Sequence, residues 1–222
     1  MPDPLVIVCI SDTHGEHERV ALPAGDVLVH AGDVTAHGTE RDWRRFLDWF
    51  GSRDFAHRLF VAGNHDTFPE RAPERAAELA REAGATWLND SGHRIDGVRF
   101  WGSPITPRFL DWSFMREPGP DIERHWALIP DDTDVLITHG PPVDVLDEVE
   151  RPDGTRERTG CPSLAARIEQ VHPALHVFGH IHEGRGRLER GGTTYLNVST
   201  MDSGYRIAHS PVVVEHPRGE IA

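Results

Sequence analysis

Uninterrupted apolar runs recur along the chain and alternate, in its first half, with segments of helical spacing. Residues 5–10 are apolar and rich in β-branched side chains, which is the pattern of a strand buried on both faces. Further runs of this kind lie at 27–30, 58–62, 135–138 and 175–178. Strands that alternate with helices predict a layered α/β fold.

Three segments predict helices. Residues 39–50 place large apolar side chains at helical spacing, and Thr39 is a suitable N-cap. Residues 69–83, rich in Ala, Glu and Arg, predict a second helix that ends at Gly84. A shorter helix is predicted at 163–171. The second half is richer in strands, with hairpins predicted at 93–101 and 187–198 and an edge strand at 212–215.

Polar clusters directly follow five of the apolar runs, and each contains side chains that can bind a metal. They are Asp12-Thr13-His14, Gly32-Asp33, Gly63-Asn64-His65-Asp66, Thr138-His139-Gly140 and Gly179-His180-Ile181-His182. Ligands bind beyond the carboxyl ends of the strands in open α/β sheets, where such loops converge. Carboxylates, a carboxamide and imidazoles without any thiolate suit divalent ions. The ligands are too many for one ion, so they predict two ions that share a bridging carboxylate, an arrangement used for displacement at phosphorus.

Each cluster by itself has an ordinary structural interpretation. An isolated Asp12 or Asp33 is more often a turn former or helix cap than a ligand. The histidines of Gly179-His180-Ile181-His182 are a weak signal alone, because alternate residues of an extended chain point to opposite faces. Five such clusters in one chain, without the signature of another catalytic centre, favour the two-metal interpretation.

Composition narrows the classes of function. The 222 residues suffice for one domain, 1–222, and all 23 basic residues are arginine, which excludes mechanisms built on a P-loop, Schiff-base or kinase lysine. The formal net charge of −13 disfavours long nucleic acids as partners. Without a run of ~20 apolar residues or a signal-peptide pattern, we expect a soluble, cytoplasmic protein with no membrane partner. Cys9 and Cys161 are expected to be free thiols.

The motifs in order, Asp-x-His, Gly-Asp, Gly-Asn-His-Asp, Thr-His-Gly-Pro-Pro and Gly-His-x-His, resemble those of the calcineurin-like metallophosphoesterase superfamily over residues 5–200. Segments 100–107, 111–114 and 179–184 resemble the branch of metallophosphoesterase domain-containing proteins, which are similar to class III cyclic nucleotide phosphodiesterases. The resemblance implies an α/β fold in four αββα layers, a sandwich of two mixed β-sheets flanked by helices.

The resemblance also implies a role for each site residue. One ion is assigned to Asp12, His14, Asp33 and His182, and the second to Asp33, Asn64, His139 and His180. His65 is implied as the general acid for the leaving group rather than a metal ligand. Some members of the branch lack one histidine of the Gly-His-x-His motif and lose activity, whereas this chain has both. Mn²⁺ is the first expectation, with iron, zinc, cobalt or magnesium as alternatives.

These inferences predict a dinuclear metal-dependent phosphoesterase that hydrolyses small phosphodiesters, such as cyclic nucleotides, by in-line attack of a metal-bridging hydroxide. The ions would supply the local positive field that an acidic chain lacks. A phosphomonoesterase or nucleotide pyrophosphatase on the same centre is the alternative. A catalytically silent interaction scaffold is a third hypothesis, against which the complete ligand set argues. The expected partner is a small phosphate ester, and the pattern predicts no oligomeric state.

The sequence says less about which substrate the site selects than about the metal ligands. Trp101, Phe109, Trp112 and Phe114 indicate either a stacking surface for a nucleobase or a loop folded by aromatic burial, and both interpretations stay open. The polar segment 148–159 predicts a long exposed loop near the mouth of the site. Five arginines near these segments are candidates for phosphate contacts, although most arginines are solvated surface residues: Arg108, Arg151, Arg156, Arg158 and Arg185.

Overall fold

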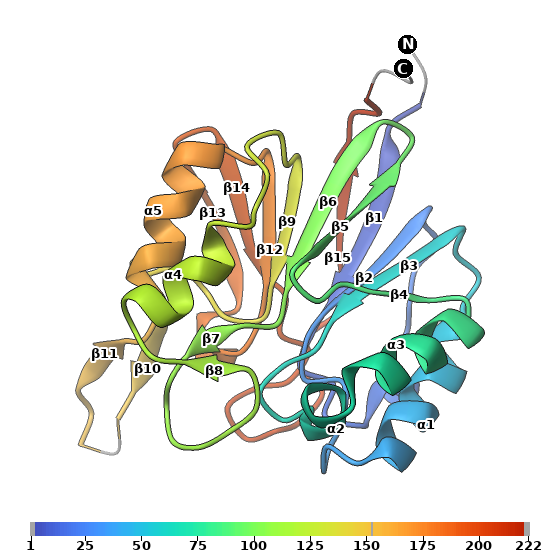
Figure 1. Cartoon of the computed structure of the whole chain (residues 1–222), viewed down its shortest axis with the longest axis horizontal. Coiled ribbons are helices and arrows are strands. Elements are labelled where there is room, and N and C mark those ends of the chain that lie inside the picture. The colour runs from blue at the N-terminus through green and yellow to red at the C-terminus, as the bar shows by residue number, and fades with distance from the viewer. Residues whose placement is uncertain (1–2, 152, 220–222) are drawn as a thin grey trace.

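The computed structural model describes residues 3–151 and 153–219 and contains two large β-sheets packed face to face, with helices on both outer sides (Figure 1). The first sheet has the order β15-β1-β2-β3-β4. Its strands are β1 (Leu5–Ile10), β2 (Val27–Ala31), β3 (His57–Val61), β4 (Thr86–Trp87) and β15 (Val212–His216). The strands β1 to β4 are parallel, and β15 pairs antiparallel with β1 at the edge. The predicted edge strand is therefore confirmed.

The second sheet has the order β13-β14-β12-β9-β6-β5. Its strands are β5 (Ser91–Ile95), β6 (Val98–Ser103), β9 (Val135–Thr138), β12 (Leu175–Phe178), β13 (Gly186–Arg190) and β14 (Thr193–Asn197). The central strands β14, β12, β9 and β6 are parallel, and each outer strand joins through a hairpin. Both hairpins confirm the prediction. Their turns, Asp96-Gly97 and Gly191-Gly192, have positive φ at both residues, as type I′ turns require.

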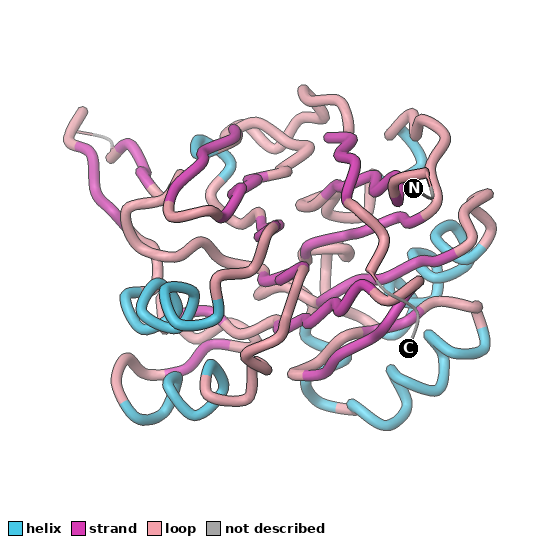
Figure 2. The backbone as a smooth tube through the Cα atoms, turned by 90° about the horizontal axis from the view of Figure 1, so that it is seen from above, coloured by secondary structure: helices cyan, strands magenta, loops and turns pink. Residues whose placement is uncertain are grey.

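The central strands β1, β2, β9 and β12 are mainly apolar because both of their faces are buried. Leu5 and Ile7 of β1 belong to the core between the sheets, together with Val135 and Ile137 of β9. Val8, the residue that follows Ile7, faces the outer core beneath the helices. On the first sheet this layer includes α1 (Glu40–Gly51) and α3 (Pro73–Glu82), and on the second it includes α4 (Pro120–Trp126) and α5 (Pro162–Val171). The four layers confirm the expected sandwich, and Figure 2 shows the helices at its periphery.

The prediction of one continuous helix at 69–83 is wrong. The segment contains two helices, α2 (Thr67–Arg71) and α3 (Pro73–Glu82). They are separated at Ala72, which has φ −138° and ψ 60°. A residue before proline is disfavoured in the α region, so Pro73 ends one helix and begins the next. By contrast, α1 begins as predicted, because Thr39 forms a capping box with Asp42.

The prediction of a long exposed loop at 148–159 is wrong, because the segment contains two paired strands. It forms an antiparallel ribbon of β10 (Glu148–Glu150) and β11 (Arg156–Arg158), while Pro152 lies outside the described residues. Opposite charges face each other across the ribbon, with Arg158 Nη2 at 2.8 Å from Glu148 Oε1. Such cross-strand pairs stabilise a strand pair without the apolar alternation on which the sequence prediction depended.

The remaining elements are short. A small parallel pair consists of β7 (Thr106–Pro107) and β8 (Met115–Arg116), and two 3₁₀ turns are η1 (His17–Arg19) and η2 (His182–Gly184). Within residues 3–151 and 153–219, every helix is too short or too polar to cross a membrane.

Candidate metal centre

The predicted site residues lie in the loops that follow β1, β2, β3, β9 and β12. These loops belong to both sheets, and the sheets meet at this edge. Ser11, at the end of β1, forms a parallel bridge with Ser199, which follows β14. The backbone N–H of His180 donates to both carboxylate oxygens of Asp12, each at 3.1 Å. Residues 168 positions apart in the sequence are thereby brought into contact.

The side chains form overlapping groups whose ligand atoms lie within 4.8 Å of one another. The groups are Asp12, His14 and His182; His14, Asp33 and His65; and Asp33, His139 and His180. The Oδ2 atom of Asp33 lies 3.6 Å from His14 Nε2 and 3.4 Å from His139 Nε2. Asn64 joins the third group, because its Oδ1 lies 2.9 Å from His139 Nε2. All eight predicted site residues are thus brought together, with Asp33 between the two halves.

The loops hold these side chains in an unusual backbone conformation. Asp12, His14, Asp33 and His180 have φ values of 52°, 41°, 55° and 69°. Non-glycine residues rarely adopt positive φ, and the cost is met where surrounding contacts determine the conformation. Here the loops bind each other, since the N–H groups of Asp12 and His14 donate to the carbonyls of Gly32 and Asp33, each at 3.0 Å.

Two of the imidazoles are oriented by the backbone. His139 Nδ1 donates to the carbonyl of Ala31 at 3.0 Å, and His182 Nδ1 donates to the carbonyl of Asp202 at 2.9 Å. Each bond directs Nε2 toward the carboxylates, which is how metal-binding histidines are commonly fixed. The Nε2 atom of His14 is buried and has no hydrogen-bond partner among the described residues. An orphaned nitrogen beside converging oxygens fits a bound cation.

The carboxylates and imidazoles of the site balance one another's charge. Burial raises the pKa of Asp12 and Asp33, but interactions with His182 and His139, respectively, dominate and hold both pKa values below their usual range. Conversely, burial lowers the pKa of His139 and His182, but Asp33 and Asp12 overcome it and raise both to about 9. Without an ion, two imidazolium protons therefore neutralise two buried carboxylates, and divalent ions would take the place of these protons.

A model of the calcineurin-like phosphoesterase family matches residues 5–184. The chain belongs to this family. It is 36% identical to metallophosphoesterase domain-containing protein 1 of Homo sapiens, over 95% of this chain and 70% of that protein. It is 38% identical to a UPF0046 protein of Caenorhabditis elegans, over 96% of this chain and 76% of that protein.

A solved structure gives an independent comparison of the fold. The phosphopantetheinyl hydrolase of Mycobacterium tuberculosis superposes with a TM-score of 0.66 over 96% of both chains, at 18% identity. At that identity the likeness concerns the fold alone. The sandwich architecture of this phosphoesterase is therefore shared with a solved hydrolase.

The phosphoesterase should bind metal more tightly as the pH rises. His139 and His182 are protonated at neutral pH because their pKa values are about 9, and a ligand nitrogen must lose its proton to bind an ion. Each ion that displaces one such proton should gain about tenfold in affinity per pH unit below about pH 9. Calorimetric titration with Mn²⁺ in buffers of different ionisation enthalpy measures both the affinity and the released protons. An affinity independent of pH, without proton release, would contradict this charge balance.

Sequence reasoning missed several residues that support the centre. Thr13 Oγ1 lies 2.9 Å from Nε2 of His30, and Thr138 Oγ1 lies 2.8 Å from Nε2 of His176. Each pair joins a ligand loop to a buried strand histidine, and burial lowers the pKa of both histidines to about 3, so they are neutral. A lone histidine within an apolar run was the available signal.

Asp66 also supports the centre, although the sequence of its motif predicts no role for it. Its carboxylate accepts hydrogen bonds from the backbone N–H groups of Val34, Thr35 and Gly63, at 3.1, 2.9 and 2.8 Å. It therefore ties the loop that carries Asp33 to the loop that carries Asn64.

Glycines let the backbone approach the candidate ligands. A Cβ atom at Gly63 would lie 2.2 Å from Asp33 Oδ1, and one at Gly179 would lie 2.1 Å from Asp12 Oδ2. Both distances are far below van der Waals contact. A side chain at either position would therefore displace a carboxylate from the centre.

Gly63→Ala should accordingly weaken metal binding by about 10- to 100-fold, the range seen when groups that orient metal ligands are changed. Metal titration by calorimetry measures this effect. Gly186→Ala is the matched control, because a Cβ there would meet its nearest atom at 3.4 Å, an ordinary contact. Equal metal affinity in the two variants would show that the position of Asp33 does not limit binding.

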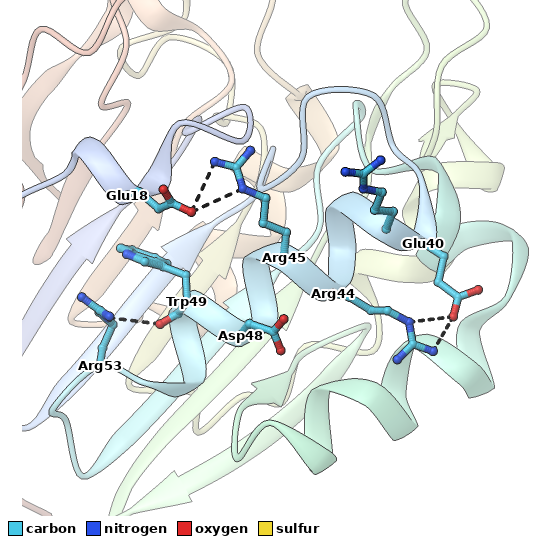
Figure 3. A pocket seen from close by; sticks show the side chains of 8 residues that line it. Glu18, Glu40, Arg44, Arg45, Asp48, Trp49 and Arg53 are labelled. Atoms are coloured by element: carbon cyan, nitrogen blue, oxygen red, sulfur yellow. Dashed lines mark hydrogen bonds and ion pairs between the residues drawn. The ribbon is translucent and has the colours of Figure 1, made fainter.

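The arginines considered for phosphate binding are engaged elsewhere. Arg108 pairs with Asp111, Arg151 with Glu157, and Arg156 and Arg158 with Glu148, while Arg185 donates to the carbonyls of Ser199 and Ser210. A hollow on the exposed face of α1 also contains arginines (Figure 3). Arg45 pairs there with Glu18 at 3.3 Å and Arg44 with Glu40 at 2.6 Å, and none of the candidate ligands lines it.

Proposed function

We propose that this phosphoesterase binds two divalent metal ions and hydrolyses small phosphodiesters. The observation that carries the proposal is the position of Asp33, whose Oδ2 lies 3.6 Å from His14 Nε2 on one side and 3.4 Å from His139 Nε2 on the other. A single carboxylate between two sets of nitrogen and oxygen donors suits a bridging ligand. Asp12, His14 and His182 would complete the first site, and Asn64, His139 and His180 the second. Nitrogen and oxygen donors without a thiolate suit several divalent ions, of which we propose Mn²⁺ first.

The residues of the chain have separate tasks in this mechanism. Two bound divalent ions would neutralise charge on the phosphoryl oxygens and lower the pKa of a bound water. The backbone N–H of His65 donates to Asp33 Oδ1 at 2.9 Å, and its ring lies edge-on to His14 with 4.7 Å between centroids. His65 is partly exposed. We assign it the proton that the leaving oxygen takes up as its bond to phosphorus breaks, opposite the attacking water.

The preference for a diester follows from the charge around the site. A phosphomonoester dianion carries one more negative charge than a diester and needs additional cationic contacts. The five arginines considered for this purpose are engaged with carboxylates or carbonyls. A phosphomonoesterase or nucleotide pyrophosphatase is therefore the second candidate, and cyclic nucleotides are among the diesters we propose. We also propose a cytoplasmic location, since Cys9 and Cys161 are both free thiols.

The test compares bis-p-nitrophenyl phosphate with p-nitrophenyl phosphate on protein reconstituted separately with Mn²⁺, Fe²⁺, Zn²⁺, Co²⁺ or Mg²⁺, with a chelated control. We expect kcat/KM to favour the diester by about tenfold or more, which is about 1.4 kcal/mol of transition-state stabilisation. Preference for the monoester would support the second candidate. Absence of both bound metal and hydrolysis would support a scaffold function instead.

A further inference from the structure

Two exposed aromatic side chains lie beside the candidate centre. Trp112 is 41% exposed, and its ring centroid lies 4.5 Å from that of His65. Tyr205 is 55% exposed, and its ring centroid lies 5.0 Å from both His14 and His182 and 6.5 Å from His65. The two rings come from loops more than 90 positions apart in the sequence. Both contact the centre on one side and leave a large aromatic area open on the other.

The loop of Trp112 is anchored to a candidate ligand residue. The N–H of Ser113 donates to the carbonyl of Asn64 at 3.2 Å, and the N–H of Thr106 donates to the carbonyl of Phe114 at 3.0 Å. The Phe114 side chain is buried, whereas Leu110 and Phe114 have positive φ values of 62° and 58°. The backbone on both sides of Trp112 is therefore held in a conformation that exposes the indole beside His65.

The loop of Tyr205 is anchored in the same manner. The carbonyl of Asp202 accepts from His182 Nδ1 at 2.9 Å and from the N–H of Tyr205 at 3.0 Å. The Asp202 carboxylate accepts from the N–H groups of Gly204 and Arg206, at 2.9 and 3.0 Å, which closes the turn. Tyr205 itself has a φ of 57°. One carbonyl therefore positions both the imidazole of His182 and the phenol ring above it.

We propose that Trp112 and Tyr205, called here the aromatic pair, bind a planar ring carried by an ester group of the scissile phosphate. The inference rests on the proposed function, because the phosphate would lie at the metal centre and the ring beside His65. Stacking provides affinity without charge, which suits a site for which the five arginines considered above are engaged with carboxylates or carbonyls. The pair selects substrates with an aryl group or a nucleobase over alkyl esters of the same charge.

The two interpretations of the aromatic segment apply to different residues. Phe114 and Trp101 pack in or against the core, whereas Trp112 is exposed at the centre. Phe114 is 3% exposed and belongs to the outer core, and Trp101 of β6 packs against that core. Burial of these two rings folds the segment, while Trp112 stays exposed at the centre. Phe109 is also exposed, at 53%, on the same loop.

The test measures equilibrium binding to protein reconstituted with Mn²⁺, using two matched ligand pairs. Benzylphosphonate and ethylphosphonate share a head group that hydrolysis cannot remove, and only the first carries a ring. Adenosine 5′-monophosphate and ribose 5-phosphate differ only by the base. Calorimetry should show that the protein binds the ring-bearing member of at least one pair about tenfold or more tightly, as base stacking on an aromatic residue provides.

Trp112→Ala and Tyr205→Ala should each remove most of that preference while the affinity for ethylphosphonate and the metal content stay unchanged. Trp112→Phe should restore much of it, because a smaller aromatic face remains. Phe109→Ala is the matched control, and it should retain the preference within about twofold, because among the described residues the rings in contact with His14, His65 and His182 include Trp112 and Tyr205 but not Phe109.

The outcomes separate this inference from the proposed function. A protein without preference for either ring-bearing ligand, or Ala variants that retain it, would overturn the role of the aromatic pair. Equal weakening of ring-bearing and ringless ligands would also overturn it, since the effect would then lie at the phosphate. Preference only within the phosphonate pair supports an aryl group as the natural ligand, and preference within the nucleotide pair supports a nucleobase. Ring preference without diester hydrolysis would refute the proposed reaction and support the aromatic pair.

Discussion

Asp33→Asn should abolish diester hydrolysis, with a loss of about 10³-fold or more, because the carboxylate we assign to both ions would lose its charge. Asp33 is 2% exposed and lies between His14 and His139. The amide retains the shape of the side chain but cannot balance two cations. It would also leave the His139 imidazolium without its partner in the metal-free protein, so the pKa of His139 should fall from about 9.

Metal analysis and turnover of bis-p-nitrophenyl phosphate test this expectation together. We expect the variant to hold fewer ions than the wild type after reconstitution and extensive dialysis. Asp42→Asn is the control, since that carboxylate lies in the exposed capping box of α1 and not in the centre. Retention of two ions with diesterase activity in Asp33→Asn would remove Asp33 from the bridging position and, with it, the main support for the dinuclear mechanism.

His65→Asn should reduce turnover by about 10²- to 10⁴-fold for an alkyl leaving group, the usual contribution of a general acid. The effect should be much smaller for p-nitrophenolate, which leaves without a proton. Metal content should stay at the wild-type level. The comparison therefore uses methyl p-nitrophenyl phosphate and a dialkyl phosphate such as a cyclic nucleotide, with metal analysis of the same samples.

The structure makes this metal analysis decisive. His65 belongs to a group with His14 and Asp33 whose ligand atoms lie within 4.8 Å of one another, so its imidazole is near enough to bind an ion. Loss of metal from His65→Asn would show that His65 is a metal ligand. An equal loss of rate for both leaving groups would contradict its role as the general acid. His14→Asn provides the contrast: the Nε2 atom of His14 is buried and has no hydrogen-bond partner within residues 3–151 and 153–219, so metal binding should depend on it.

The elements that were predicted well are those whose burial leaves a clear local pattern in the sequence. The strands β1, β2, β3, β9 and β12 lie within one residue of the predicted runs, because a strand buried on both faces is apolar along most of its length. The helix α1 was equally clear, since its cap and its buried face are both local signals. The wrong predictions concern segments in which another interaction overrides the local sequence pattern. Pro73 divides a helix whose composition is helical throughout, and charge pairs order the ribbon of β10 and β11 without an apolar face.

The sequence by itself determined which residues are available to the centre, because each candidate ligand directly follows an apolar strand and its neighbours permit a tight turn. It could not determine how the residues combine. Asp12 meets His180 across 168 positions, and Trp112 meets His65 through a loop with no regular pattern. Such contacts depend on strand order, on the packing of two sheets and on strained loop conformations, none of which leaves a periodic trace. The tertiary structure therefore decided that Asp33 lies between two sets of candidate ligands, that His30 and His176 support the loops that carry them, and that Trp112 and Tyr205 both lie beside His65.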